Sequence, residues 1–188
     1  MSEIEIAGAV LGVINIILLI RRSIWNYPFG IAMVILYGIV FFQARLYSDA
    51  TLQVFFLLIQ FYGWWAWLRA QGPGGAVAVT HLTTNGRLWW AIGIVLATLA
   101  DCWFLATRTN DAAPWPDAFT TVLSLAAQYL LSVRRPENWL LWIAVDIVSI
   151  GLYFWRGLYP TTALYVIFLA MASAGLLQWR RAERAFAA

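Results

Sequence analysis

Polar and aromatic side chains recur on one side of an otherwise apolar stretch, NWLLWIAVDIVSIGLYFWRG, at residues 138–157. At about 100° per residue of an α-helix, these side chains fall within an arc of roughly 80°. They are Asn138, Trp142, Asp146, Ser149 and Tyr153. Together they offer amide and hydroxyl hydrogen bonds, an aromatic face and one carboxylate. Such a face inside an apolar helix predicts contact with a partner or a ligand rather than with lipid.

Two further apolar stretches carry a polar face by the same helical count. One has Gln53, Gln60, Trp64 and Trp67, and the other has Thr121, Ser124, Gln128 and Ser132. At about 1.5 Å per residue, Gln60 and Gln128 lie roughly 15 Å from the outer ends of their helices, and Asp146 lies about 12 Å from the cytoplasmic end of its own. All three are therefore expected near the membrane midplane. Hydrogen bonding between helices is the alternative role for Gln60 and Gln128.

The elements that position these side chains are expected to be membrane helices. Of 188 residues, 63% are hydrophobic and 11% are charged, whereas a soluble domain has about 25% charged residues. A helix needs about 20 apolar residues to cross the hydrocarbon core. Seven segments meet this requirement, at about 4–20, 24–44, 50–68, 88–106, 118–133, 138–155 and 160–179. The sequence predicts an all-α integral membrane protein.

The arginines predict the orientation of the helices, because cytoplasmic loops carry an excess of positive charge. With the N-terminus outside, nine of the twelve basic residues fall on the cytoplasmic side and three on the outer side. The outer three are Arg45, Arg108 and Arg156. The C-terminus is then cytoplasmic. A nucleic-acid partner is not expected, since the sequence has no basic groove or stacking platform.

The second half of the chain repeats the first at an offset of 112 residues. Between Arg22 and Ala70, 16 of 49 positions are identical without a gap, including Asn26/Asn138, Gly63/Gly175 and Trp67/Trp179. Apolar helices share leucines by composition alone, but shared Asn, Gly, Trp and Arg in one register indicate a true repeat. The same offset places the first span on the fifth.

Each repeat thus has three helices, and the extra span at 88–106 restores the second repeat to the orientation of the first. The predicted architecture is 3+1+3 with parallel repeats: 1–70 as the first repeat, 71–110 as loop and linker helix, and 111–188 as the second repeat. In transporters built from such repeats the substrate site lies between them near the midplane. The repeat therefore favours a transport function.

The residues of both repeats resemble the PnuC-type vitamin transporter family over nearly the whole chain. Its Q-x-x-G-W element falls on Gln60, Gly63 and Trp64. Its N-W-x-x-W-x-x-x-D element falls on Asn138, Trp139, Trp142 and Asp146. The resemblance implies a fold similar to the SWEET sugar transporters, a homotrimer, and facilitated diffusion of nicotinamide riboside, thiamine or riboflavin in the bacterial inner membrane.

The binding-site residues implied by the motifs are Gln60, Trp64, Asn138, Trp142 and Asp146. Tyr37, Asn26 and Gln128 are added mainly from the helical-face argument. These groups suit an aromatic cation such as nicotinamide riboside. Tryptophan faces attract cations by about 1–2 kcal/mol when desolvated, amides bond a carboxamide or ribose hydroxyls, and an ionised Asp146 supplies the counter-charge.

Two other classes of function stay open. A membrane-embedded enzyme would need a catalytic constellation, yet H-E-x-x-H and G-x-S-x-G are absent, and the chain has one histidine and one cysteine. A structural or sensor protein would bind a ligand without transporting it. No cofactor, metal site or coupling ion is predicted, although Asp146 would allow coupling to protons.

Two expectations concern residues near the ends of the spans. Tryptophans there usually form an interfacial belt, which is the expected role of Trp67, Trp89, Trp90, Trp115 and Trp179. His81, the only histidine, falls in the loop at 70–87 and is expected to be a solvated loop residue.

Overall fold

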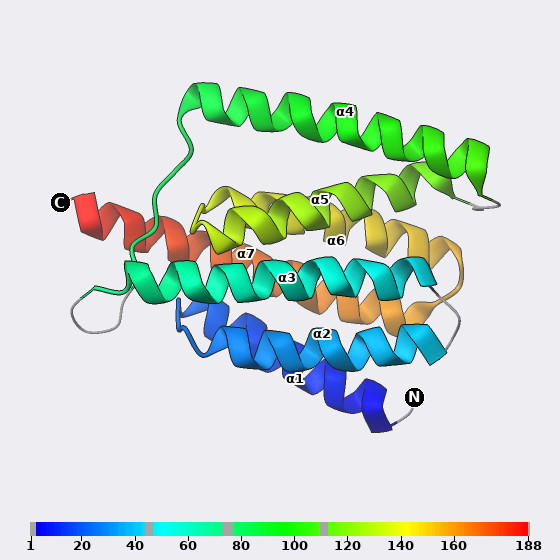
Figure 1. Ribbon diagram of the computed structural model, residues 1–188, viewed down its shortest axis with the longest axis horizontal. Coiled ribbons are helices and arrows are strands. Elements are labelled where there is room, and N and C mark those ends of the chain that lie inside the picture. Colours follow the sequence, from blue (N-terminus) through cyan, green and yellow to red (C-terminus); the bar gives the residue numbers. More distant parts are fainter. Residues whose placement is uncertain (1–2, 44–46, 73–76, 110–112, 188) are drawn as a thin grey trace. The chain divides into compact units, whose positions relative to one another are not determined.

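The computed structural model describes residues 3–43, 47–72, 77–109 and 113–187. These residues form seven α-helices and no strand beyond an isolated bridge between Gln71 and Val77 (Figure 1). The helices are α1 (Glu3–Ile20), α2 (Asn26–Gln43), α3 (Tyr47–Ala70), α4 (Thr84–Arg108), α5 (Pro114–Ser132), α6 (Glu137–Trp155) and α7 (Tyr159–Ala187). The all-α prediction is confirmed for the described part of the chain.

Five of these helices contain a segment that is long and apolar enough to cross a membrane: Asn26–Gln43, Ala50–Ala70, Thr84–Arg108, Glu137–Trp155 and Thr161–Arg184. The other two predicted spans do not meet the same criteria. In α1 the apolar part is the shorter stretch Ile6–Ile20, because acidic residues stand at its start. In α5 two prolines, an aspartate and a row of Ser, Thr and Gln lower the mean hydropathy.

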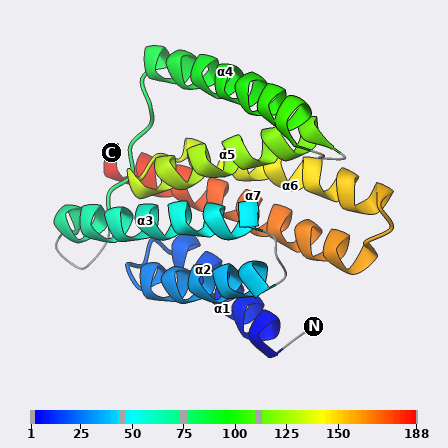
Figure 2. The same cartoon turned by 45° about the vertical axis from the view of Figure 1, so that its right-hand side comes forward.

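The chain forms two compact units. The first comprises Met1–Val79, Leu131–Arg134 and Gln178–Ala188, and the second comprises Thr80–Leu130 and Arg135–Leu177. In the first unit α2 packs against both α1 and α3, and it lies between them in Figure 1 and Figure 2.

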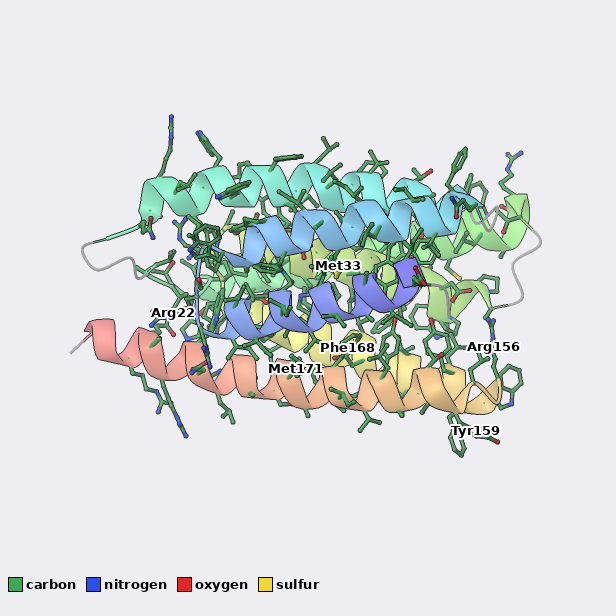
Figure 3. All side chains as sticks on the ribbon, turned by 90° about the horizontal axis from the view of Figure 1, so that it is seen from below. Arg22, Met33, Arg156, Tyr159, Phe168 and Met171 are labelled. Carbon is green, nitrogen blue, oxygen red and sulfur yellow. The ribbon has the colours of Figure 1, made fainter. Side chains whose placement is uncertain are left out.

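Glycines bring α1 close to α2 in the first unit. A Cβ atom added at Gly12 would lie 3.0 Å from the sulfur of Met33, which is labelled in Figure 3. One added at Gly8 would lie 3.1 Å from the ring of Tyr37. Small residues let helix backbones approach closely, which is how helices associate within lipid.

Aromatic contacts join the helices of the second unit. Trp139 of α6 lies against Gly175 of α7, and the rings of Tyr153 and Tyr165 are 5.2 Å apart. Gly157 adopts φ 73° in the turn from α6 to α7, which Arg156 and Tyr159 flank in Figure 3. A residue without Cβ is favoured at such an angle.

The turn after α1 closes by a hydrogen-bond pattern that usually needs glycine. Arg22 has φ 56°, its N–H donates to Leu19 O at 2.9 Å, and the Ser23 N–H donates to Leu18 O at 2.9 Å. This is a Schellman motif. A non-glycine residue with these angles is strained by about 1–3 kcal/mol, and the Arg22 guanidinium offsets part of it by donating to Val77 O at 3.2 Å.

The turn after α5 repeats this geometry 112 residues later. Arg134 has φ 60°, its N–H donates to Leu131 O at 2.9 Å, and the Arg135 N–H donates to Leu130 O at 2.8 Å. The Arg134 guanidinium donates to Ala66 O at 3.1 Å. The offset found in the sequence is therefore matched by main-chain geometry at both turns.

The belt expectation is wrong for Trp67 and Trp179. Both side chains are fully buried, and their rings lie 5.9 Å apart. The Trp67 indole N–H donates to Leu131 O at 3.3 Å, and that of Trp179 donates to Leu19 O at 3.1 Å. Helix-end carbonyls thus draw these indoles inside.

The remaining tryptophans of that prediction lie differently. Trp89 is 70% exposed and Trp115 is 56% exposed, as expected for residues that face the membrane interface. Trp90 is half-buried and its ring lies 5.6 Å from that of Tyr129.

The contact between Trp139 and Gly175 generates the first prediction. A Cβ atom at position 175 would lie 2.6 Å from three ring carbons of Trp139. Gly175→Ala should therefore lower the stability by about 1–3 kcal/mol, the range for overpacked sites. The measurement is the thermal unfolding midpoint of the purified protein in detergent.

Gly151→Ala is the matched control, because nothing lies within 4 Å of a Cβ added there. Its midpoint should stay unchanged or rise slightly, since alanine favours helix over glycine. Equal midpoints for the two variants would contradict close packing at Gly175.

Candidate substrate-binding site

Gln60 of α3 lies in a buried polar cluster of the first unit. Its side chain is 4% exposed. A Cβ atom added at Gly30 of α2 would contact Gln60 Nε2 and would lie 2.8 Å from Asn15 Nδ2. The two amide groups therefore fill the space that a side chain at position 30 would occupy.

Asn15 of α1 connects this cluster to the start of α2. It is 8% exposed, and its Nδ2 donates to the main-chain oxygen of Asn26 at 2.6 Å. Gln60 Oε1, by contrast, is buried without a hydrogen-bond partner among the described residues. A buried unsatisfied acceptor costs about 1–3 kcal/mol. The cluster therefore presents an acceptor that a ligand donor would satisfy.

Tyr27 adds a second polar group at the same end of α2. Its side chain is fully buried, and its hydroxyl has no hydrogen-bond partner in the described part of the chain. The ring packs on Gly63 of α3, where an added Cβ would lie 2.7 Å away, and meets Trp67 edge-on at 5.3 Å. Tyr27 and Asn15 were not predicted as site residues.

The other predicted residues of the first unit differ in position. Asn26 is buried and its Nδ2 donates to Ser23 O at 2.7 Å, so part of its amide stabilises the preceding turn. Tyr37 lies two turns beyond Gly30 on α2, where its ring stacks on Phe41 at 5.8 Å and contacts Gly8. Trp64 is half-buried on α3. Asn15 links Asn26 to the Gln60 cluster, whereas Tyr37 packs at the contact of α1 with α2.

The polar face of α6 is buried in the second unit, as the helical count predicts. Asn138 is fully buried, Asp146 and Ser149 are each 4% exposed, and Trp142 is half-buried. Tyr165 of α7 interacts with Asp146 and Ser149. Tyr165 is a further site residue that the motifs did not indicate, although its place in an apolar span was a signal.

Asn138 occupies the same structural position as Asn26. Its Nδ2 donates to Arg135 O at 2.6 Å, three residues earlier, as Asn26 Nδ2 does to Ser23 O. Asn138 Oδ1 is buried and has no hydrogen-bond partner among the described residues. Its amide therefore holds the turn with one end and has an acceptor available at the other.

Gln128 of α5 lies on the buried polar face of its own helix. It is 8% exposed, Ser124 is 9% exposed and Ser132 is 1% exposed. The predicted face of the fifth span is thus confirmed as buried, in a segment whose hydropathy is too low for a lipid-exposed helix.

A loop clamp, formed by residues 80–87 and the start of α6, holds Asn138 in place. Glu137 Oε1 accepts from Leu82 N at 3.1 Å and from Arg87 Nε at 2.9 Å, and His81 Nδ1 lies 3.3 Å from it. Arg135 donates to the carbonyl oxygens of Thr80 and His81, each at 3.0 Å. His81 is therefore part of a structural contact, contrary to the expectation of a solvated side chain.

The chemistry of both units is that of binding. The described residues include no group of three or more His, Cys, Asp or Glu that could hold a metal ion. What they offer are amide groups with available acceptors, phenol and indole rings, and one carboxylate. These groups recognise a polar aromatic molecule by hydrogen bonding, stacking and charge.

Comparison with known proteins places the chain in a family. The family model described as nicotinamide mononucleotide transporter matches residues 2–181. The nicotinamide riboside transporter PnuC of Escherichia coli is 31% identical, over 98% of this chain and 87% of that protein. The riboflavin/roseoflavin transporter RibM of Streptomyces davaonensis is 30% identical, over 93% and 83% respectively.

A solved structure agrees with these relatives. The crystal structure of the vitamin B3 transporter PnuC has a TM-score of 0.79 and 28% sequence identity, covering 95% of this chain and 80% of that one. The family match, the coverage and the fold are consistent with one another, and the chain belongs to the PnuC-type nicotinamide mononucleotide transporter family.

Proposed function

We propose that this protein transports nicotinamide riboside across the bacterial inner membrane and thereby supplies the cell with a precursor of NAD. The observation that carries the proposal is the buried face of α6, where Asn138, Trp142 and Asp146 lie on one side of a membrane span. Its groups match a substrate with a pyridinium cation, a carboxamide and a ribose. The named function of the Escherichia coli relative supports the same substrate.

The charge of the site favours nicotinamide riboside over other candidates. Riboflavin, named for the Streptomyces relative, is uncharged and would not need the carboxylate of Asp146. Nicotinamide mononucleotide carries a phosphate, and a phosphate site normally includes basic groups. None of the proposed binding residues is basic: Gln60, Trp64, Asn138, Trp142, Asp146, Tyr37, Asn26 and Gln128.

We propose parallel 3+1+3 repeats as in the SWEET transporters, with 1–70 and 111–188 as the repeats and 71–110 as loop and linker. The paired left-handed arginines Arg22 and Arg134 support it, as do the paired amide bonds of Asn26 and Asn138. Movement by facilitated diffusion and assembly as a homotrimer are further parts of the proposal. They are supported by resemblance to the family.

Transport by purified protein in proteoliposomes tests the function. Uptake of nicotinamide riboside should saturate, and the recovered compound should keep its mass, which separates transport from catalysis. Binding without uptake would indicate a sensor instead. Absence of saturable uptake of nicotinamide riboside, thiamine and riboflavin would overturn the proposal.

Asp146→Asn should weaken nicotinamide riboside more than its reduced form, which has a similar shape but no charge. A hydrogen bond to a charged group contributes about 1.5–3 kcal/mol, so the affinity for the cation should fall by at least tenfold. Calorimetry on purified protein measures both ligands. Equal affinities of the parent and the variant for the cation would show that Asp146 does not respond to ligand charge.

Trp142→Ala should weaken both forms, because stacking depends only partly on charge. Trp155→Ala is the matched control, since Trp155 is 82% exposed near the end of the same helix.

Gly30→Ala should weaken nicotinamide riboside by displacing the Gln60 amide. The added Cβ would contact Gln60 Nε2 and approach Asn15 Nδ2, and one lost neutral hydrogen bond contributes about 0.5–1.5 kcal/mol. A drop in affinity of about two- to tenfold is expected by calorimetry. Gly38→Ala is the control, because its Cβ would lie at an ordinary 3.6 Å from Gln53 Cβ. Unchanged binding in Gly30→Ala would remove Gln60 from the site.

The orientation is proposed from charge, with the N-terminus outside and the C-terminus in the cytoplasm. A fluorescent protein that matures only in the cytoplasm should therefore be bright when fused after residue 188. A dark fusion, together with an active periplasmic reporter at the same end, would reverse the topology.

A further inference from the structure

A pocket near the C-terminal end of α3 contains two guanidinium groups. It has a volume of about 310 Å³ and is lined by Tyr62, Trp65, Arg69 and Arg134, with two alanines and a valine. None of these residues belongs to the proposed substrate site.

The arginines of the pocket are held by contacts that leave their charge uncompensated. The Arg69 guanidinium lies over the Trp65 ring, 4.2 Å from its centroid. Arg134 donates through one nitrogen to Ala66 O, although a guanidinium has five N–H donors. In the described part of the chain, neither has a carboxylate within ion-pair distance. Two fixed positive groups at one pocket favour a phosphate.

An apolar stripe on α3 leads to this pocket. Phe55, Leu58, Tyr62, Trp65 and Arg69 follow one another at spacings of three and four residues, which places them within an arc of roughly 80° on the helix. The four residues before Arg69 are 42–62% exposed. In a membrane span this exposed stripe faces hydrocarbon, and it ends at the positive charge of the last turn.

A stripe of this kind beside a basic pocket matches an amphiphile with an acyl chain and an anionic head. We infer that this pocket binds the phosphate of an anionic phospholipid, with an acyl chain along Phe55, Leu58, Tyr62 and Trp65. Basic pockets at the cytoplasmic ends of membrane helices bind such head groups. The aromatic rings belong at the level where head group and chain meet.

The positions 112 residues later give an internal comparison. Arg69 corresponds to Arg181, but Tyr62 corresponds to Ala174 and Trp65 to Leu177. Arg181 is exposed near the same end of its helix, without the aromatic groups that build the pocket. It therefore provides a control with the same charge and a similar place on its helix.

Native mass spectrometry of the purified full chain tests the inference with three probes: phosphatidylglycerol, phosphatidylcholine and inorganic phosphate. Phosphatidylglycerol should bind more tightly than phosphatidylcholine. Arg69→Gln should weaken it by about five- to tenfold, the effect of one arginine near an anionic head group. Arg181→Gln should leave its affinity unchanged. Arg134→Gly, which preserves the left-handed turn, should weaken it as Arg69→Gln does.

Several results would overturn the inference. Equal weakening by Arg69→Gln and Arg181→Gln would reduce the effect to general surface charge. Equal binding of phosphatidylcholine would remove the role of net charge. Inorganic phosphate bound as tightly as phosphatidylglycerol would indicate a soluble anion in place of a lipid. Trp65→Ala that changes the oligomeric mass, but not the number of bound lipids, would show that another copy of the chain covers the stripe.

Discussion

Hydrogen bonding of helix-end carbonyls, in a region without water, is the constraint on which the rest of this structure depends. Leu19 O and Leu131 O stand at the ends of α1 and α5, where helices have carbonyls without an intrahelical partner. Each accepts a main-chain N–H in its turn and an indole N–H from a buried tryptophan. Because unsatisfied groups are expensive in hydrocarbon, these bonds hold both turns.

The turns in turn set the position of the helices that carry the site. Asn26 and Asn138 stand at the starts of α2 and α6, and each bonds back to the turn before it. Trp142 and Asp146 follow Asn138 at one and two turns along α6. A shift of the α5–α6 turn would therefore move every polar group on that face together.

The corresponding positions of the two repeats have exchanged their chemistry while keeping this frame. Gly30 corresponds to Trp142, and Gln60 corresponds to Ala172. Where the second repeat has an indole, the first has a glycine whose space is filled by the amides of Gln60 and Asn15. One repeat thus contributes amides and the other contributes an aromatic face and a carboxylate, which are different requirements of one polar aromatic substrate.

The helices and the α6 face were predictable because they depend on local periodicity. Runs of about 20 apolar residues mark spans, and a count of 100° per residue identifies Asp146 and Ser149 as one buried face. The extension of α7 to Ala187 was not predictable from hydropathy, because its last turns are charged. Asn15 and Tyr165 were missed because their partners come from other helices. Trp67 and Trp179 were misplaced for the same reason: a distant carbonyl outweighs the usual preference of tryptophan for the interface.

The bond from Trp179 to Leu19 also has a consequence for biosynthesis, since it joins residues 160 positions apart. Synthesis at about 5–20 residues per second separates the two by roughly 8–32 s. During that interval α1 is already made, but its final carbonyl lacks the indole that it has in the finished protein. The first turn can therefore reach its final hydrogen bonding only after nearly the whole chain has been translated, which makes insertion of the last helix the step that completes the first.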